Sequence, residues 1–500
     1  MSSDPFDVAI VGYGPVGQTL AILLAQAGRR VVVLEKQPTP YTLPRAVHFD
    51  HEVARILQAA GLGDAIPRLS EPADVYEWQN AAGETLLRIG SAEMGLSGWP
   101  ESNMFSQPEL ERALEARVAS FPTVEVRRGA EVVDLHTTDD EVVVDVRDGA
   151  SVRARWVVGC DGANSFVRRR IGATVTDLGF FFDWLIVDVV PHEPRVWNPI
   201  NGQICDPARP TTVVSGGPGR RRWEFMRLPG EEIDALNNEA TAWRLLKPWH
   251  LHPGNATLER HAVYTFQARW VDGWRQGRVL LAGDAAHQMP PFAGQGMCAG
   301  IRDAANLAWK LDLVLAGKAH DALLDTYPTE RIPQVRQVIE FSIELGKVIC
   351  VADPAAAAAR DAVMIPAARA RGPQPPLPTP AIGHGLAVEG DHLAGHLFVQ
   401  SQVRGGRFDD VVGRGFALVS SVADPSTVLA PGLAAYFASV GGITAHVAPE
   451  EDVTDAYARW FELHDVAVVL QRPDFHVFGT ATTLAGCNAL VESLRNQLER

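Results

Sequence analysis

The chain has 500 residues, of which 46% are hydrophobic and 21% charged, a balance typical of a globular protein with roughly two to four domains. Its 45 Lys and Arg residues are outnumbered by 60 Asp and Glu residues, and the net charge of −15 disfavours nucleic acid or an anionic membrane as a partner. The N-terminus lacks a signal-peptide pattern, no apolar run reaches the ~18 residues of a membrane span, and the five cysteines include no CxxC pair, so we expect a cytoplasmic protein.

The first segment predicts a strand, a helix and a second strand. Residues 7–11 are a short apolar run, residues 16–27 are rich in Ala and Leu as in a buried helix, and residues 30–34 are β-branched. Because a unit of this kind places its two strands parallel, a parallel sheet is expected here.

A glycine-rich turn, Gly12-Tyr13-Gly14-Pro15-Val16-Gly17, joins the first strand to the helix. In such a turn the first glycine makes the bend, the second lets backbone approach a pyrophosphate, and the third lets the helix pack on the strand. Glu35 follows Gly17 by 18 residues, where a carboxylate can hold a ribose and disfavours a 2′-phosphate. The turn predicts a dinucleotide site but does not distinguish FAD from NAD.

The middle of the chain changes character. Residues 141–146 and 152–158 predict strands, and between about 180 and 266 short β-type runs alternate with Gly and Pro turns. That alternation favours a separate, mostly antiparallel lobe. Residues 278–281 return to a buried strand, and residues 301–316 predict a helix.

Two later motifs favour FAD. Cys160-Asp161-Gly162 follows one predicted strand, and Gly283-Asp284 follows another and leads to Pro-Pro-Phe-Ala-Gly-Gln-Gly-Met at 290–297. The second motif forms a further cradle, in which Asp284 would accept from a ribityl hydroxyl. The N–H groups of Gly296 and Met297 would face the N1–C2 carbonyl region of a flavin.

The three motifs, in this order, resemble the signatures of the single-component flavin aromatic hydroxylases, the p-hydroxybenzoate and phenol hydroxylase group. Stretches spread over residues 7–345 resemble the 3-(3-hydroxyphenyl)propionate hydroxylases more closely; they begin at Phe166, Trp184, Cys205, Arg222 and Asp321. The resemblance implies a monooxygenase that uses FAD, NADH or NADPH, and O₂ to hydroxylate a small phenolic substrate. The sequence has no second GxGxxG, which Baeyer–Villiger enzymes need, and no Trp-x-Trp-x-Ile-Pro motif of flavin halogenases.

The resemblance also assigns cofactor contacts. It places Arg45 and Gln107 beside the flavin, Val132 against the adenine, and Asp161 near both the FAD and the nicotinamide phosphates. The full predicted set is Gly12, Gly14, Pro15, Val16, Gly17, Glu35, Lys36, Arg45, Gln107, Val132, Asp161, Asp284, Gly294, Gln295, Gly296 and Met297. Cys298 departs from the family, which usually has Asn there, and the departure concerns flavin positioning rather than flavin binding. No metal site is expected.

Candidates for catalysis are few. His48 lies three residues after Arg45, and its ordinary pKa near 6.5 suits a base that deprotonates a phenol; the alternative is a loop histidine bonded to backbone. Asp50 is expected to be a helix N-cap, and His287 to have a structural role. Pro291, whose carbonyl can orient a hydroxyl, and Phe292 are predicted to wall the substrate pocket on the flavin side.

The antiparallel lobe supplies further substrate candidates, namely Trp184, Phe225 and Tyr264, for which plain core packing is the alternative. A substrate with a carboxylate tail would need a cation. The basic run at 220–222 precedes a strand and is expected to be a solvated edge.

The expected fold is α/β. A Rossmann-type FAD-binding lobe spans 1–179 and, with a helical region, 271–371; a mostly antiparallel substrate lobe is inserted at 180–270. A Pro-rich linker at 372–390 leads to a thioredoxin-like C-terminal domain at 391–500, whose lack of CxxC indicates a structural or dimer-supporting role, with a homodimer as the expected assembly.

The expected function is hydroxylation of a monocyclic phenol similar to 3-(3-hydroxyphenyl)propionate. One alternative is a tailoring hydroxylase of a polycyclic aromatic polyketide or antibiotic. More distant ones are a flavin oxidase or reductase without oxygen insertion and a non-catalytic flavoprotein that binds an aromatic ligand.

Overall fold

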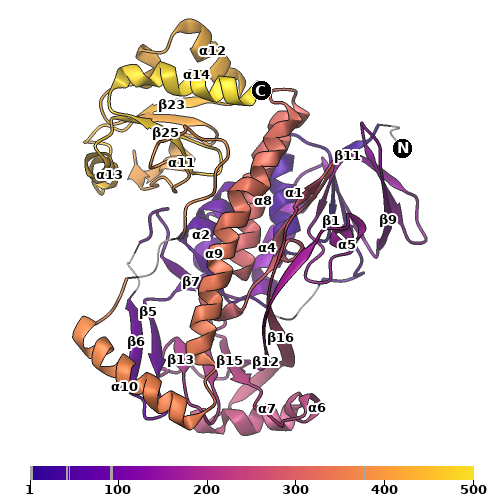
Figure 1. Cartoon of the computed structure of the whole chain (residues 1–500), viewed down its shortest axis with the longest axis vertical. Helices are drawn as coiled ribbons and strands as arrows, with labels where there is room; N and C mark the ends of the chain where they lie inside the picture. The colour runs from indigo at the N-terminus through magenta and orange to yellow at the C-terminus, as the bar shows by residue number, and fades with distance from the viewer. Residues whose placement is uncertain (1–3, 41–42, 44, 91–93, 376–378) are drawn as a thin grey trace.

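The computed structural model describes residues 4–40, 43, 45–90, 94–375 and 379–500. Figure 1 shows one sheet around β1 (Phe6–Val11), a second sheet around β12 (Val175–Pro191) and β16 (Ala256–Val271), and a smaller domain at the C-terminus. The long helices α8 (Gly296–Leu315) and α9 (Thr326–Ile349) run between these bodies. No helix in the described ranges is long and apolar enough to cross a membrane.

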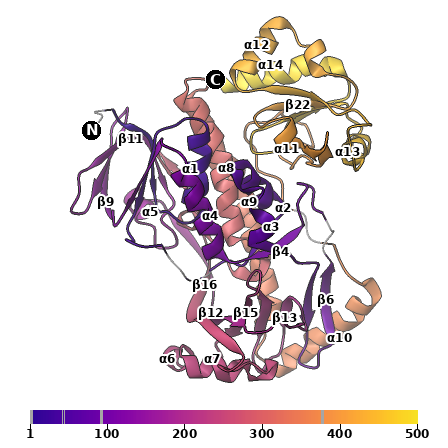
Figure 2. The same ribbon diagram turned by 180° about the vertical axis from the view of Figure 1, so that it is seen from behind.

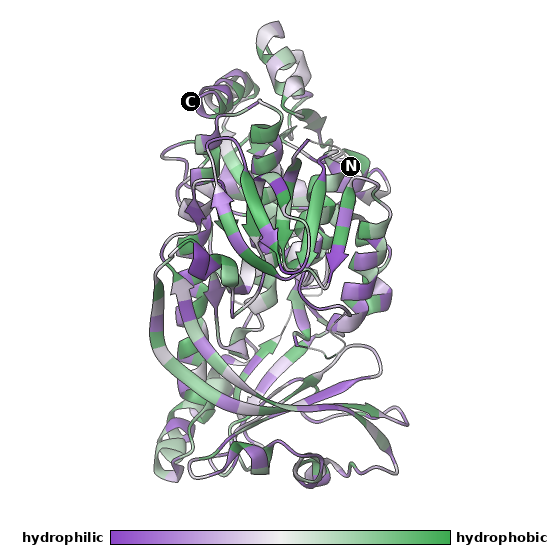
Figure 3. Ribbon diagram, turned by 90° about the vertical axis from the view of Figure 1, so that its right-hand side faces the viewer, coloured by the Kyte–Doolittle hydropathy of each residue, from purple (hydrophilic) through white to green (hydrophobic). Residues whose placement is uncertain are grey.

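The first sheet confirms the predicted strand–helix–strand unit. β1 pairs in parallel with β2 (Val31–Glu35) and with β11 (Val152–Gly159), and α1 (Pro15–Gln26) packs against α8 and α4 (Gln107–Ala119). The central strands are almost entirely apolar (Figure 3), as expected for parallel strands covered on both faces. The other strands are β8 (Val124–Arg128), β9 (Val132–Thr137), β10 (Val142–Val146), β17 (Arg275–Gln276) and β18 (Val279–Leu281).

The second sheet is the predicted antiparallel lobe, but it takes strands from a wider range than 180–270. β5 (Val75–Gln79) and β6 (Thr85–Gly90) extend it, so the division at residue 180 leaves part of this sheet in the wrong lobe. β5 joins through a parallel pairing, which hairpin-based reasoning does not anticipate. The remaining strands are β13 (Gly202–Ile204), β14 (Thr211–Ser215), β15 (Arg221–Met226) and β19 (His287–Gln288).

The two faces of the second sheet are covered by different elements. Side chains on one face pack with α6 (Ile233–Leu236) and α7 (Glu239–Leu246). The other face packs against α9 and α10 (Pro354–Arg371), where an aromatic cluster lies. A three-stranded sheet has the order β3 (His48–Asp50), β7 (Ser102–Phe105), β4 (Ser70–Pro72). β3 runs directly into α2 (His51–Leu57), and α3 (Ile66–Leu69) leads into β4.

The C-terminal domain is a four-stranded sheet in the order β23, β22, β24, β25, flanked by helices. Its thioredoxin-like character stays a prediction. Its elements are α11 (Phe408–Val411), β22 (Ala417–Ser420), α12 (Pro431–Ser439), β23 (Ile443–His446), α13 (Ala456–His464), β24 (Val468–Gln471), β25 (Val477–Ala481) and α14 (Cys487–Leu498). Residues 376–378 of the expected linker lie outside the described ranges.

The C-terminal domain is joined to the rest of the chain by buried apolar and charged contacts. Trp309 and Leu313 of α8 belong to the same hydrophobic cluster as Phe416 of the domain. Arg472 of the domain donates to both carboxylate oxygens of Glu330 in α9, at 2.9 and 2.7 Å, and both side chains are buried. Composition marks the Pro-rich segment as a domain boundary, but the parts of the chain on its two sides share a buried interface.

We predict that Arg472→Ala lowers the free energy of unfolding by about 3–5 kcal/mol, because it removes a cation shared by two buried carboxylates, Glu330 and Asp474, and leaves only Lys310 on Glu330. Denaturant unfolding of the purified protein measures the change. Arg495→Ala is the matched control in the same domain; it removes an exposed pair with Glu492 and should cost at most about 1 kcal/mol. Equal effects of the two variants would contradict the role of the buried pair.

Candidate active site

The glycine-rich turn has the shape that a pyrophosphate needs. Gly12 has φ = 103°, and a Cβ there would overlap the carbonyl of Cys160; a Cβ on Gly17 would overlap the carbonyl of Gly12. A Cβ on Gly14 would meet no atom within 4 Å, so that residue borders open space. No side chain caps the N-terminus of α1, which begins at Pro15, and its first N–H groups remain available to an anion.

The adenosine end of the predicted site lies at the end of β2. The carboxylate of Glu35 accepts from the N–H groups of Tyr13 (2.9 Å) and Gln37 (2.8 Å), which fixes it beside the glycine turn. The carbonyl of Glu35 accepts from Ala130, two residues before Val132, so the sheet brings these predicted contacts together. Lys36 is exposed next to them.

The Asp161 and Asp284 motifs meet the same turn. One oxygen of Asp161 accepts from Phe166 N (2.7 Å) and Val167 N (3.1 Å) at the start of α5 (Phe166–Arg170), while Oδ1 is buried with no partner within the described ranges. Asp284 is exposed, and the adjacent Gly283 lies against Val16. A buried carboxylate oxygen without a partner and an open carboxylate fit a cofactor rich in hydroxyl groups.

His287 has the expected structural role. It is buried, and its Nε2 lies 2.7 Å from Asp303 of α8, whose other oxygen accepts from Arg331 of α9 at 2.8 Å. The pair joins the Asp284 motif to the two long helices.

The turn at 290–297 packs directly on His48. Nδ1 of His48 lies 3.3 Å from the carbonyl of Gly294, a residue at φ = 65° whose Cβ would be 2.8 Å from that nitrogen. The thiol of Cys298 points to the carbonyls of Gly294 (3.6 Å) and His48 (3.8 Å). Burial raises the pKa of Cys298, so the thiol remains protonated and can donate to the turn. Cys298 therefore replaces the family's usual residue without opening the turn.

The side chain of Gln295 is already engaged by protein. Its amide donates to Asp50 at 3.0 Å and accepts from Arg302 at 2.8 Å, which fixes the orientation of the side chain. Asp50 also accepts from Val53 N at 3.1 Å, which confirms it as the N-cap of α2. Arg302, which sequence reasoning missed, links these residues.

The loop that carries Arg45 is held from two sides. Gln107 accepts from Ala46 N at 2.7 Å, and Nη1 of Arg222 donates to the carbonyl of Arg45 at 2.5 Å. Pro44, part of the same motif, lies outside the described ranges. The side chain of Gln107 therefore helps to hold this loop in place.

The expectation of a solvated edge at 220–222 is wrong for two of its three residues. Arg221 and Arg222 are each 2% exposed, and only Arg220 is half-buried. β15 is covered on both faces, so Arg221 and Arg222 are both buried although they are adjacent in sequence. Arg222 forms a two-pronged pair with Asp188 of β12 at 2.7 and 3.0 Å.

An aromatic cluster lies where the second sheet meets the 290–297 turn. Trp184 stacks on Phe266 at 6.2 Å between ring centroids and contacts Phe292 edge-on at 5.8 Å. Tyr264 is the neighbour of Trp184 on β16, and a Cβ on Gly346 of α9 would overlap Phe180 and Phe292. Nε1 of Trp184 is buried and has no partner within the described part of the chain.

Phe225 does not join this cluster, and its prediction as a substrate contact is wrong. It pairs with Leu185 across β12 and β15, whereas Trp184 pairs with Met226. Because side chains alternate between faces along a strand, Phe225 points to the far face, 6.1 Å from Trp249. Sequence reasoning also missed Phe180, Phe182 and Phe266; the three consecutive phenylalanines at 180–182 are the signal that could have indicated them.

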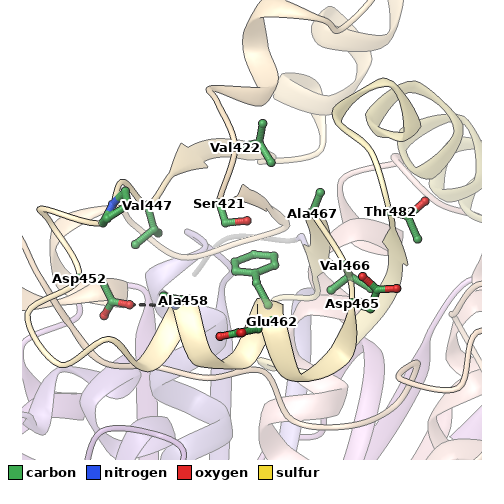
Figure 4. Close-up of a pocket in the computed structure, with 12 residues that line it drawn as sticks. Ser421, Val422, Val447, Asp452, Ala458, Glu462, Asp465, Val466, Ala467 and Thr482 are labelled. Carbon is green, nitrogen blue, oxygen red and sulfur yellow. Dashed lines mark hydrogen bonds between the residues drawn. The ribbon is translucent and has the colours of Figure 1, made fainter.

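Two open cavities border the described structure. One, of about 330 Å³, shares Phe182 and Met226 with the aromatic cluster. The other, of about 410 Å³, lies in the C-terminal domain between Val422, Phe461 and Glu462 (Figure 4). None of the predicted site residues lines either cavity, and Asp452 of the second accepts from backbone N–H groups of α13.

We predict that Gly14→Ala weakens FAD binding by roughly tenfold or more, a change of at least about 1.4 kcal/mol, because the new methyl group fills the space open to the pyrophosphate. It should not destabilise the apoprotein, since the methyl group meets no protein atom. Titration of apoprotein with FAD and a thermal melt give the two quantities. Gly273→Ala is the control, because its new methyl group also meets nothing within 4 Å. Unchanged FAD affinity in Gly14→Ala would contradict pyrophosphate binding at this turn.

The comparisons agree with this geometry. The FAD binding domain family matches residues 5–342, and the HcaD C-terminal domain family matches residues 395–497. The chain is 41% identical to the "Probable NADH-specific resorcinol 4-hydroxylase" of Rhodococcus jostii (strain RHA1), over 98% of this chain and 94% of that protein. It is 36% identical to the 3-(3-hydroxy-phenyl)propionate/3-hydroxycinnamic acid hydroxylase of Mycobacterium sp. (strain KMS), over 95% and 88% of the two chains.

A solved structure shares the fold. The flavin-dependent monooxygenase PieE, in complex with FAD and substrate, superposes with a TM-score of 0.80 over 100% of both chains at 22% identity. Together with the glycine turn and the two aspartate motifs, these matches confirm the α/β fold and the aromatic-hydroxylase resemblance. The chain belongs to the FAD binding domain family and is an FAD-dependent aromatic hydroxylase.

Proposed function

We propose that this hydroxylase acts on a monocyclic phenol with a second substituent meta to its hydroxyl, and that NADH is its electron donor. Both relatives named above act, by their names, on phenols of this pattern, and one name specifies NADH. The observation that carries the proposal is the position of the aromatic cluster: Trp184 and Phe266 lie against Phe292, in the turn that also contacts His48.

The charges around the cluster favour a neutral ring over one with a carboxylate tail. Arginines of this lobe already lie beside acidic side chains: Arg222 bonds to Asp188, Arg260 lies 3.9 Å from the same carboxylate, Arg227 contacts Asp183, and Arg360 contacts Asp361. A propionate would have to displace one of these carboxylates or remain unpaired, which is costly in a buried site. A resorcinol-type phenol therefore fits better than the 3-(3-hydroxyphenyl)propionate type expected from sequence.

Binding of the ring uses apolar and polar groups. The aromatic side chains exclude water, and Nε1 of Trp184 is a buried donor that a substrate oxygen would satisfy. The carbonyl of Pro291 accepts from Gly294 N at 2.8 Å, and its second lone pair can accept from a substrate hydroxyl. FAD, bound at the glycine turn and reduced by NADH, supplies the activation of O₂.

His48 is the proposed base. The Gly294 carbonyl can only accept, so Nδ1 of His48 carries the hydrogen in the neutral ring, and Nε2 presents a lone pair with no partner in the described ranges. Removal of the ring from water lowers the pKa of His48, which keeps it neutral at neutral pH. A neutral imidazole can take the phenol proton and make the ring electron-rich.

A substrate panel tests the proposal. NADH oxidation and product mass are measured with resorcinol, 3-(3-hydroxyphenyl)propionate, 4-hydroxybenzoate and a polycyclic phenol, and NADPH is tested in parallel. We expect resorcinol to give the highest kcat/KM and a product one oxygen atom heavier. Turnover of the polycyclic phenol alone would contradict the monocyclic assignment. Faster turnover of the propionate than of resorcinol would contradict the charge argument.

The pH dependence of His48→Asn tests the base. In the wild type, kcat/KM should be constant at neutral pH and fall as the pH drops through the His48 pKa, below 6.5, because the protonated ring cannot accept a proton. The variant should lose about 10²–10⁴-fold at neutral pH, and the loss should shrink near the substrate's own phenol pKa of about 10. His192→Asn, which changes an exposed histidine just after β12, is the control. If kcat/KM of the variant fell at low pH as it does in the wild type, His48 would not be the base.

A further inference from the structure

The hairpin tip at 472–476, between β24 and β25, inserts into the FAD-binding part of the molecule. Phe475 has φ = 70° and is 3% exposed, and it belongs to the core cluster of the first sheet rather than to that of its own domain. The guanidinium of Arg55 in α2 lies 4.2 Å from the centre of its ring. In Figure 2, α2 lies beside α8 and α9 on the side that the C-terminal domain covers.

The hairpin tip meets a polar stripe of α8. Arg302, Asn306 and Lys310 are spaced four residues apart and so share one face of that helix. Asn306 donates to Asp474 of the tip at 2.8 Å, and Lys310 donates at 2.6 Å to Glu330, the partner of Arg472. These contacts anchor the domain.

One residue of the tip contacts a different group. Nδ1 of His476 lies 2.9 Å from the carbonyl of Asp474, and its Nε2 lies 3.9 Å from Glu52 of α2. The other oxygen of Glu52 accepts from Nε of Arg302 at 2.5 Å. His476 also lies 3.6 Å from Oδ1 of Asp474, a partner of Arg472, so its ring stands between the anchor and the group that holds Arg302.

Arg302 connects this contact to the active site. Besides Glu52, it donates to Asp50 at 2.5 Å and to Gln295 at 2.8 Å. Gln295 lies in the turn proposed to face the flavin, and Asp50 is two residues after His48. Because one guanidinium serves two buried carboxylates, the ring of His476, 3.9 Å from Glu52, limits the movement of that carboxylate and so keeps Arg302 on Asp50 and Gln295.

We propose that His476 is a positioning residue of the hydroxylase: through Glu52 and Arg302, the C-terminal domain fixes the flavin-facing turn and the His48 segment. The proposal rests on the assignment of the turn at 290–297 to the flavin. It gives the domain a part in the reaction although it has no dithiol and contributes no residue to the substrate cluster. Loosening this relay should weaken flavin binding and let NADH be oxidised without hydroxylation.

The test compares three variants of the full-length holoenzyme. His476→Ala removes the contact with Glu52, and His476→Gln keeps a polar side chain of similar reach. His392→Ala, an exposed histidine of the same domain, is the control. The readouts are the FAD dissociation constant, the flavin absorption spectrum, the fraction of NADH oxidation that yields hydroxylated resorcinol, and Tm.

We expect His476→Ala to weaken FAD binding by about 3- to 30-fold and to lower the hydroxylated fraction, with Tm close to that of the control. His476→Gln should recover most of both. FAD affinity, spectrum and hydroxylated fraction equal to those of His392→Ala would overturn the proposal. So would a large loss of Tm in both His476 variants, which would make His476 part of the anchor. If the wild-type protein did not bind FAD, the assignment of the flavin site would be wrong, and the proposed role of His476 would be wrong for that reason.

Discussion

Arg302 lies buried in α8, and its nitrogens donate to side chains from α2, from the N-cap before it and from the turn at 290–297. Burying a cation is unfavourable unless carboxylates and hydrogen bonds compensate it. Asp50 and Glu52 provide that compensation, which raises the pKa of Arg302 and lowers that of Asp50 despite their burial. The three segments therefore cannot shift independently: His48, the turn at 290–297 and the start of α2 have one common support.

Local patterns predicted the parts of the structure that depend on local geometry. The glycine turn, the strand–helix–strand unit and the Asp50 N-cap each follow from a few neighbouring residues, and the structure contains all three. The faces of the second sheet were harder to predict. Phe225 and Trp184 are both large and aromatic, and only the register of β12 against β15 shows that they point in opposite directions.

Long-range charge pairing was not predictable from the sequence. Arg222 in a basic run has the pattern of a solvated edge, and its partner Asp188 lies 34 residues away on another strand. In the same way, Arg472 and Asp474 have the composition of a surface turn. Their burial depends on Glu330, which precedes them by more than a hundred residues, so no local window contains the information.

The insertion of Phe475 also limits how such proteins can be recombined. A Pro-rich segment suggests a module that evolution could exchange as a unit, yet the hairpin tip is part of the core of the neighbouring domain. A foreign C-terminal domain would have to bring an aromatic tip, a matching Arg and Asp, and the same hairpin length. Otherwise Arg55 would lose Asp409 and Glu330 would lose Arg472 in an unfilled interface. Inheritance of the two domains as a single unit is the expected outcome, with compensating substitutions confined to the tip and to the polar face of α8.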